Sequence, residues 1–307
     1  MASEQPPAPL PSGAAASSGS SGGSSSKIPS KAGTMLARTP PALDAFIAHL
    51  HRCMQTPAGI DTVLLFVAYA SRLTASALDA ATRTALRGRL AALLLAIPAR
   101  GGSTTVVVKT PAAAVKVLAT SARLRALAAL LSEARMVMRL WGLLGLYLSL
   151  RKLVAHTWAG KGKENDPEKA RQQRLDGLMA WARLTLGIAF QVLENAGLLA
   201  HKGVLNLRPA TAGWCMRWAT RAWSAGTFVE IMRLLVEHSR KQAGDVSSAE
   251  YRKWKEGWTG DFVRNAAWAP ITVHLSVDKG FVSEPVIGGL ATLAGWIQMS
   301  RLWRETA

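Results

Sequence analysis

The stretch from Leu184 to Ala200 is an apolar run of 17 residues in which Glu194 is the only charge. This length lies at the lower end of what crosses a bilayer, and His201, Lys202 and Gly203 close the run. Such a run is typical of a membrane span, of a helix in a protein core, or of an apolar pocket around a catalytic carboxylate. The rest of the chain has to decide between these three interpretations.

Helical patterns dominate the remainder of the sequence, and no segment has a persuasive strand pattern. A short helix is expected near residues 43–53, and polar residues recurring every three or four positions predict longer helices over 61–97 and 111–154. Further helices are expected between Leu175 and the end of the chain. We therefore predict an all-α, membrane-associated protein with amphipathic interfacial helices and one or two membrane-embedded segments.

Composition divides the chain into four regions. Residues 1–40 are rich in Ser, Gly, Ala and Pro and predict a disordered low-complexity tail. A basic helical region is expected over 41–158, a charged and turn-rich linker over 159–174, and a C-terminal helical region over 175–307.

The positive net charge of the chain indicates an anionic partner. There are 37 Lys and Arg against 19 Asp and Glu, a net charge of +18. Phosphates of nucleic acid or of lipid headgroups both fit this excess. Because the sequence has no zinc-finger or RRM pattern, and because 11 Trp favour a membrane interface, we expect an anionic phospholipid membrane and no nucleic acid.

The clearest helical pattern lies at about 113–141, where polar and apolar residues occupy opposite faces. Arg on one face with Leu, Met and Trp on the other is typical of a helix that lies in a membrane interface. A surface helix packed on a soluble core remains an open alternative. The expected lipid-binding residues are Arg125, Arg135 and Arg139 on the polar face, and Leu124, Leu127, Leu131, Met138 and Trp141 on the apolar face.

A membrane segment is predicted at about 282–303. Residues 285–300 carry no charge, and Gly288, Gly289 and Gly295 are of the kind that packed membrane helices tolerate. Trp296 would lie near one interface. A buried helix or a re-entrant segment is the alternative.

The sequence offers no catalytic constellation. The GKGK segment at 160–163 lacks phosphate-loop spacing, and His49, His51 and Cys53 point to different sides of a helix. We therefore expect no enzyme activity, no cofactor and no metal. Glu194 and Asn195 are interpreted as structural polar groups paired within the bundle, with Arg183 or Lys202 as partners, and Gly203 as a left-handed helix stop.

Four blocks of the sequence, spread over residues 43–304, resemble the peroxin-11 family of peroxisomal membrane proliferation proteins, most closely its divergent fungal branch. The matching residues are Gly59, Asp61, Tyr69 and Arg72 in the first block, Ser132, Arg135, Arg139 and Leu140 in the second, Glu194, Asn195, Lys202 and Gly203 in the third, and Arg264, Asn265, Pro270 and His274 in the fourth.

The resemblance implies an integral protein of the peroxisomal membrane. An amphipathic helix would insert into one leaflet and elongate the organelle before fission. Homo-oligomers and contacts with the fission machinery, a dynamin-related GTPase and its adaptors, are also implied.

Two other functions stay open at this point. A pore or metabolite channel would use Glu194 and Lys202 to line a polar pathway, since an ionisable residue inside a membrane is a functional candidate. A soluble helical adaptor that binds anionic surfaces would need no insertion at all.

Overall fold

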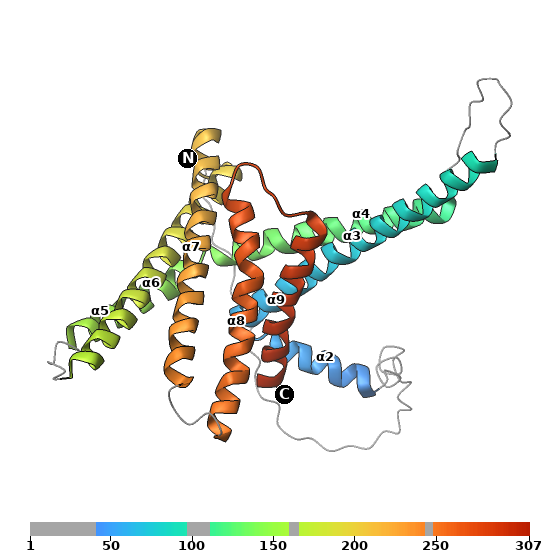
Figure 1. The fold of residues 1–307 in the computed structure, drawn as a ribbon. Helices are drawn as coiled ribbons and strands as arrows, with labels where there is room; N and C mark the ends of the chain where they lie inside the picture. The colour runs from blue at the N-terminus through green and yellow to red at the C-terminus, as the bar shows by residue number, and fades with distance from the viewer. Residues whose placement is uncertain (1–40, 97–110, 160–165, 243–247) are drawn as a thin grey trace, which may run out of the picture. The chain divides into compact units, whose positions relative to one another are not determined.

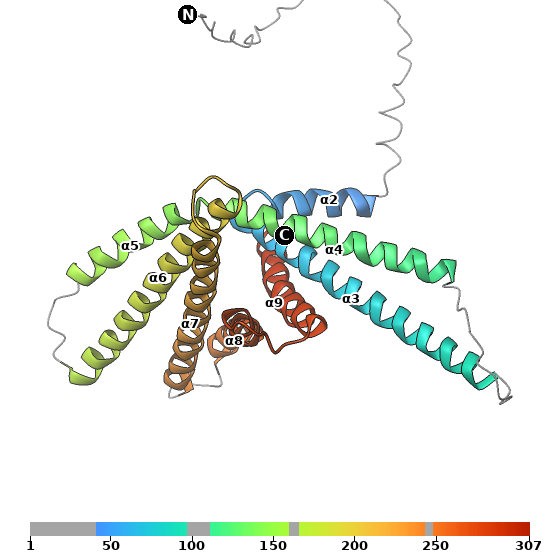
Figure 2. The same cartoon turned by 90° about the horizontal axis from the view of Figure 1, so that it is seen from above.

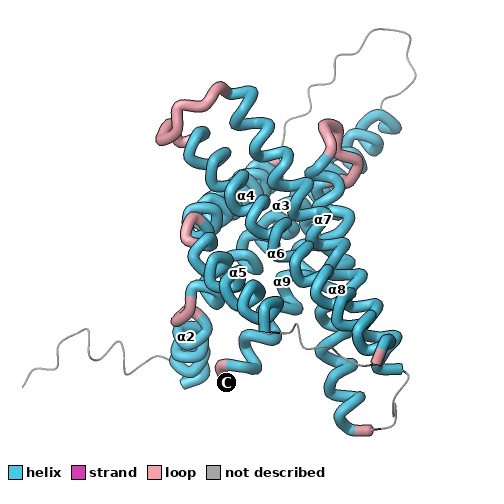
Figure 3. Tube along the Cα trace, turned by 90° about the vertical axis from the view of Figure 1, so that its left-hand side faces the viewer, coloured by secondary structure: helices cyan, strands magenta, loops and turns pink. Residues whose placement is uncertain are grey.

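The structure, a computed structural model, describes residues 41–96, 111–159, 166–242 and 248–307. All regular elements in these ranges are helices, which confirms the predicted all-α class (Figure 1, Figure 3). The predicted tail at 1–40 and the GKGK segment lie outside the described residues. The helices are α2 (Pro41–Cys53), α3 (Pro57–Ala96), α4 (Ala112–Arg139), α5 (Gly142–Ala159), α6 (Pro167–His201), α7 (Pro209–Gln242), α8 (Ala249–Ser276) and α9 (Glu284–Glu305).

The chain divides into two compact units, residues 1–47 and 48–307. The first unit contributes the beginning of α2, and the second contains the rest of α2 together with α3–α9. Described residues on both sides of the segment predicted as a charged linker, 159–174, belong to the second unit.

The charged segment is also shorter than predicted, because α6 begins inside it. Asp166 caps the helix, and its Oδ1 accepts a hydrogen bond from the backbone N–H of Glu168 at 3.0 Å. Pro167 follows as the first helical residue, where its fixed φ suits the helix and its missing N–H is not needed. Pro167, which lies inside the predicted linker, is therefore part of a helix start.

Neighbouring helices pair along their lengths in the second unit. Figure 1 and Figure 2 show α3 beside α4 and α5 beside α6, and α6 also packs along α7. Asp61, near the start of α3, pairs with Arg135 near the end of α4, while Asp79, later in α3, pairs with Arg125, earlier in α4. These two helices therefore run antiparallel.

The hydrophobic core lies between α3, α8 and α9. Its buried members are Leu65, Ala267, Trp268, Ile271, Ala291 and Ala294.

Two of the glycines predicted to pack closely bring α9 against α3. A Cβ at Gly295 would lie 2.7 Å from Cδ2 of Leu65, and one at Gly288 would lie 3.4 Å from Cα of Leu73. Gly289 would meet no atom within 4 Å. Gly288 and Gly295 therefore lie in close contact with α3, whereas Gly289 does not.

Among the described helices, the one long and apolar enough to cross a membrane is α3, over Pro57–Leu93. Neither the predicted segment at 282–303 nor the run Leu184–Ala200 meets that standard. Charged and polar residues at the ends of α6 and α9 lower their apolar character, whereas α3 remains apolar over a longer stretch. Length and composition are the only grounds on which this helix is distinguished.

Candidate functional site: a buried seam of ion pairs below an apolar face

The third sequence block meets the second through Glu194 and Arg139. Glu194 lies in α6 with its side chain 9% exposed, and Arg139 is the last residue of α4. Nε of Arg139 donates to Oε2 of Glu194 at 3.0 Å, and Nη2 donates to Oε1 at 2.7 Å. Two parallel hydrogen bonds of this kind fix both the distance and the orientation of the two groups.

Two amides of α6 stabilise the break between α4 and α5 at the same point. Nε2 of Gln191 donates to the carbonyl of Arg139 at 2.8 Å, and Nδ2 of Asn195 donates to that of Leu140 at 3.2 Å. These bonds satisfy carbonyls that lose helical partners where the helix stops. The single helix predicted over 111–154 is thus two helices.

Gly142 permits this close approach. A Cβ at Gly142 would lie 2.7 Å from Oε1 of Gln191. Since that distance is well inside van der Waals contact, a larger residue would push the amide away from the break.

A second ion pair joins the first sequence block to the second. Nε and Nη2 of Arg135 donate to the two carboxylate oxygens of Asp61 at 2.8 and 3.1 Å. The side chain of Arg135 is only 10% exposed. A guanidinium at this depth needs a carboxylate partner, because an unpaired charge would be costly to bury.

Asp79 holds the far end of the seam. It accepts hydrogen bonds from Oγ of Ser121 and from Nη2 of Arg125, each at 2.5 Å. Ser121 and Asp79 are both buried. The pairs of Asp79, Asp61 and Glu194 with the α4 arginines are called the ion-pair seam below.

The ion-pair seam corrects the predicted arrangement of α4. Arg125, Arg135 and Arg139 were expected to face lipid headgroups, but all three pair with carboxylates of the chain itself. Their stripe faces the other helices, because Asp61 and Asp79 on α3 lie along its path.

The face of α4 opposite the ion-pair seam exposes apolar side chains, and α5 exposes further ones. Leu130 is 64% exposed and Trp141 73%, while Leu124, Leu131 and Met138 are half-buried. We call the following exposed set the apolar face: Val115, Leu127, Leu130 and Val137 on α4, Trp141 at the helix break, and Leu144, Tyr147 and Leu148 on α5.

Lys202 and Glu194 pair with different residues of α4. Lys202 forms an ion pair with Glu133 of α4, and this hydrogen bond lowers the pKa of Glu133. Glu194 instead faces Arg139, so the partners suggested from the sequence, Lys202 and Arg183, are both wrong.

Gly203 ends α6 as predicted. Its φ is +75°, the left-handed conformation that glycine adopts without strain. The N–H of Gly203 donates to the carbonyl of Ala200 at 3.1 Å, and that of Val204 donates to Leu199 at 2.9 Å. These are the two bonds of a Schellman cap, and the predicted helix stop is confirmed.

The remaining residues of the first block have separate packing roles. A Cβ at Gly59 would lie 1.9 Å from the carbonyl oxygen of Cys53, so the turn from α2 into α3 requires glycine. Tyr69 packs edge-on against Trp268 at 5.6 Å between ring centroids. Arg72 reaches Glu284 of α9 at 3.4 Å.

The fourth block lies in α8. Arg264 pairs with Asp261 at 3.3 Å, and Nδ2 of Asn265 donates to the carbonyl of Asp261 at 2.8 Å. Nδ1 of His274 accepts a hydrogen bond from the N–H of Val282 at 2.8 Å. Arg264 and Asn265 also line a hollow, while Trp296 of the predicted membrane segment is 57% exposed.

Asp79 in the seam, and Gln191 and Gly142 at the helix break beside it, were not indicated as site residues by the sequence patterns. Asp61 and Asp79 are 18 residues apart, which is five turns at 3.6 residues per turn. This places both carboxylates on one face of a largely apolar helix. Carboxylates on an apolar helix need cationic partners, so this spacing could have indicated the ion pairs from the sequence.

No family model, curated protein or solved structure matches the chain. In the ranges that the structure describes, no group of three or more His, Cys, Asp and Glu side chains is arranged to hold a metal ion.

Proposed function

We propose that this chain is an integral membrane protein that bends and elongates the peroxisomal membrane and promotes division of the organelle. The observation that carries the proposal is the orientation of α4, whose arginine stripe is paired inside while its leucine and tryptophan face is open. Polar groups of membrane proteins face the bundle and pair there. In water the same apolar face would be a large exposed patch.

The ion-pair seam supports a wedge mechanism. It fastens α4 to α3 and α6, so the apolar face is presented by a braced helix rather than by a free one. Insertion of this face into the acyl boundary of one leaflet would expand that leaflet. Many copies held together by self-association would then bend the bilayer.

Attraction to anionic headgroups has to come from arginines and lysines outside the seam. Arg123, Arg151 and Lys152 are exposed on α4 and α5. Each basic residue near an anionic surface contributes about 1 kcal/mol to membrane binding. This assignment replaces the seam arginines in the proposed mechanism.

The peroxisomal location and the fission partners rest on the resemblance to the peroxin-11 family. The contacts between the matching blocks support it, because Asp61 meets Arg135 and Arg139 meets Glu194. The residues that carry the sequence resemblance thus join the first block to the second and the second to the third. The dynamin-related GTPase and its adaptors remain part of the proposal.

The test combines two variants of the full chain. Replacing Leu127 and Leu130 by Gln removes apolar area from the open face without emptying a packed site, since both are exposed. Thr120→Gln with Ser149→Gln is the matched control at two exposed polar positions. We expect the first variant to lose tubulation of anionic liposomes and the control to keep it.

Equal tubulation by both variants would contradict the wedge mechanism. A tagged full chain that washes off peroxisomes in carbonate would favour the soluble adaptor, and a tag that does not reach peroxisomes would remove the organelle assignment. Ion conductance in planar bilayers that is lost in Glu194→Gln would favour the pore.

A further inference from the structure

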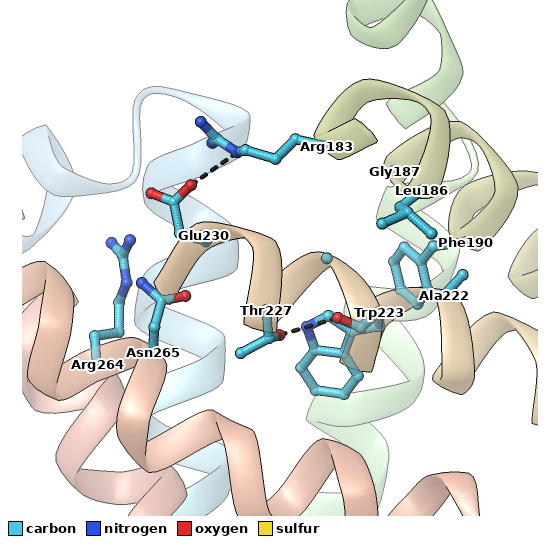
Figure 4. A pocket seen from close by; sticks show the side chains of 11 residues that line it. Arg183, Leu186, Gly187, Phe190, Ala222, Trp223, Thr227, Glu230, Arg264 and Asn265 are labelled. Atoms are coloured by element: carbon cyan, nitrogen blue, oxygen red, sulfur yellow. Dashed lines mark hydrogen bonds and ion pairs between the residues drawn. The ribbon is translucent and has the colours of Figure 1, made fainter. Parts of the chain in front are cut away.

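A hollow of about 270 Å³ lies between α6, α7 and α8 (Figure 4). Figure 4 shows charged and amide side chains toward one end and aromatic rings toward the other. The polar lining is Arg183, Glu230, Arg264 and Asn265, and the larger apolar lining is Leu186, Phe190 and Trp223.

The polar end carries an excess of positive charge. Glu230 accepts from Arg183 and from Arg233, each at 2.8 Å. Asp261 lies 3.3 Å from Arg264 and 3.1 Å from Arg301. Glu237 also pairs with Arg233. The network therefore holds four guanidinium groups, two around Glu230 and two around Asp261, against three carboxylates. Its net charge is one positive.

Two arginines of this network remain accessible from the hollow. The side chain of Arg183 is 47% exposed and that of Arg264 is 26% exposed. A guanidinium has five N–H donors in a planar fork, so one carboxylate does not exhaust it. Asn265 adds an amide, which has two N–H groups and uses one for the carbonyl of Asp261.

Small residues leave the hollow open. Ala222, Gly187 and Gly226 lie in its lining. A Cβ at Gly226 would meet only Cβ of Leu186, at 3.9 Å, and one at Gly187 only Cδ2 of Leu146, at 3.6 Å. Both are ordinary contacts, so neither position requires glycine, and a larger side chain at Gly226 would lie beside Leu186, which lines the hollow.

We infer that this hollow binds an anionic phospholipid, with the phosphate against Arg183 and Arg264 and the first part of an acyl chain along Phe190 and Trp223. Arginine suits a phosphate because its fork matches two oxygens at once. Pockets that enclose a whole drug-sized ligand measure roughly 300–1,000 Å³. The smaller hollow here therefore takes the head and the first carbons, while the remaining tail lies outside.

This inference rests on the proposed function, since a membrane supplies the lipid. The proposed lipid would bind between α6, α7 and α8 and not on the apolar face. Such a lipid would join three helices and bring a negative charge to a site with one positive charge in excess.

The test is a calorimetric titration of the full chain, purified in neutral detergent, with dioctanoyl phosphatidic acid. We expect saturable binding of this probe, and none for inorganic phosphate or for dioctanoylglycerol, which lack the tail and the phosphate respectively. Gly226→Leu should weaken binding at least about tenfold by filling the hollow. Gly177→Leu, on α6 with no atom within 4 Å of its added Cβ, is the matched control and should bind normally.

Arg264→Gln gives an independent second variant. Its affinity should fall about tenfold, as expected for one charge-assisted hydrogen bond, and Arg264→Lys should recover part of the loss. Unchanged binding by folded Gly226→Leu, or inorganic phosphate binding as tightly as the lipid, would overturn the inference. If Gly226→Leu does not fold, equal affinities of Arg264→Gln and the native chain overturn it.

Liposome tubulation separates this inference from the proposed function. A native chain that tubulates liposomes without saturable lipid binding overturns the inference alone. Saturable binding that is lost in Arg264→Gln, in a chain that does not tubulate, supports the inference and contradicts the proposed function.

Discussion

The guanidinium of Arg139 and the carboxylate of Glu194 form two hydrogen bonds, at 3.0 and 2.7 Å, where α4 ends and α5 has not yet begun. The two partners are unequally buried, with side chains 30% and 9% exposed. Loss of Arg139 therefore leaves the more deeply buried charge without a partner. The pair joins α4 to α6 where the arginine stripe of α4 reaches the break between α4 and α5.

Arg139→Gln should destabilise the protein more than Glu194→Gln does. Breaking a buried pair costs roughly 3–5 kcal/mol, and the partial exposure of Arg139 places Glu194→Gln toward the lower end of that range. The double variant should cost less than the sum of the two, because neither charge is then left alone. Chemical unfolding in detergent measures all three.

Glu305→Gln is the control for this series, since Glu305 is exposed at the end of α9. Its free energy of unfolding should stay close to that of the native chain. Strict additivity in the double variant would show that the contact contributes nothing to stability.

Gly142→Leu should separate α4 and α5 from α6. The new side chain would meet Gln191, whose Oε1 lies 2.7 Å from the position of an added Cβ. Overpacking of this kind typically costs about 1–3 kcal/mol, and displacement of Gln191 would also expose the carbonyl of Arg139. Gly145→Leu, one turn later with no atom within 4 Å of its added Cβ, should be tolerated.

The comparison is made by thermal unfolding of both variants under the same detergent conditions. A Gly142→Leu variant as stable as Gly145→Leu would show that the helix break does not depend on close contact with α6.

The sequence predicted the helices and the polar stripe of α4, but the direction expected for that stripe, toward lipid headgroups, was wrong. A period of 3.6 residues shows that Arg125, Arg135 and Arg139 share a side of α4. It does not show whether that side meets solvent or protein. Their partners lie 46, 74 and 55 residues away along the chain, and only the packing of α3 and α6 brings them close.

Local features were predictable, because neighbouring residues determine them. The left-handed turn at Gly203 follows from glycine after the last apolar residues of α6. The hollow lined by Arg183 and Arg264 was not predictable, since its residues come from α6, α7 and α8 and share no sequence pattern.

Gly203→Ala should destabilise α6 by about 1 kcal/mol, because a residue with a Cβ is strained at a φ of +75°. Gly213→Ala provides the opposite case. Gly213 lies within α7, and its added Cβ would meet only Nη1 of Arg217, at 3.8 Å. Alanine there should stabilise by roughly 0.5–1 kcal/mol. Equal shifts of the unfolding midpoint in the two variants would contradict the capping role.

Charge reversal distinguishes the seam arginines from the exposed basic residues. Arg125, Arg135 and Arg139 changed together to Glu would place three new carboxylates against Asp79, Asp61 and Glu194. We expect this variant to unfold, because like charges at these positions repel in a poorly solvated site.

Arg123, Arg151 and Lys152 changed together to Glu should leave folding intact, because these three side chains are exposed. Their loss should weaken binding to anionic vesicles, with a larger effect at low salt than at high salt because screening by ions shortens the reach of surface charges. Vesicle flotation and circular dichroism of both triple variants test the two effects. If instead the seam variant folds normally and loses vesicle binding, its arginines face headgroups, and the paired arrangement does not persist on a membrane.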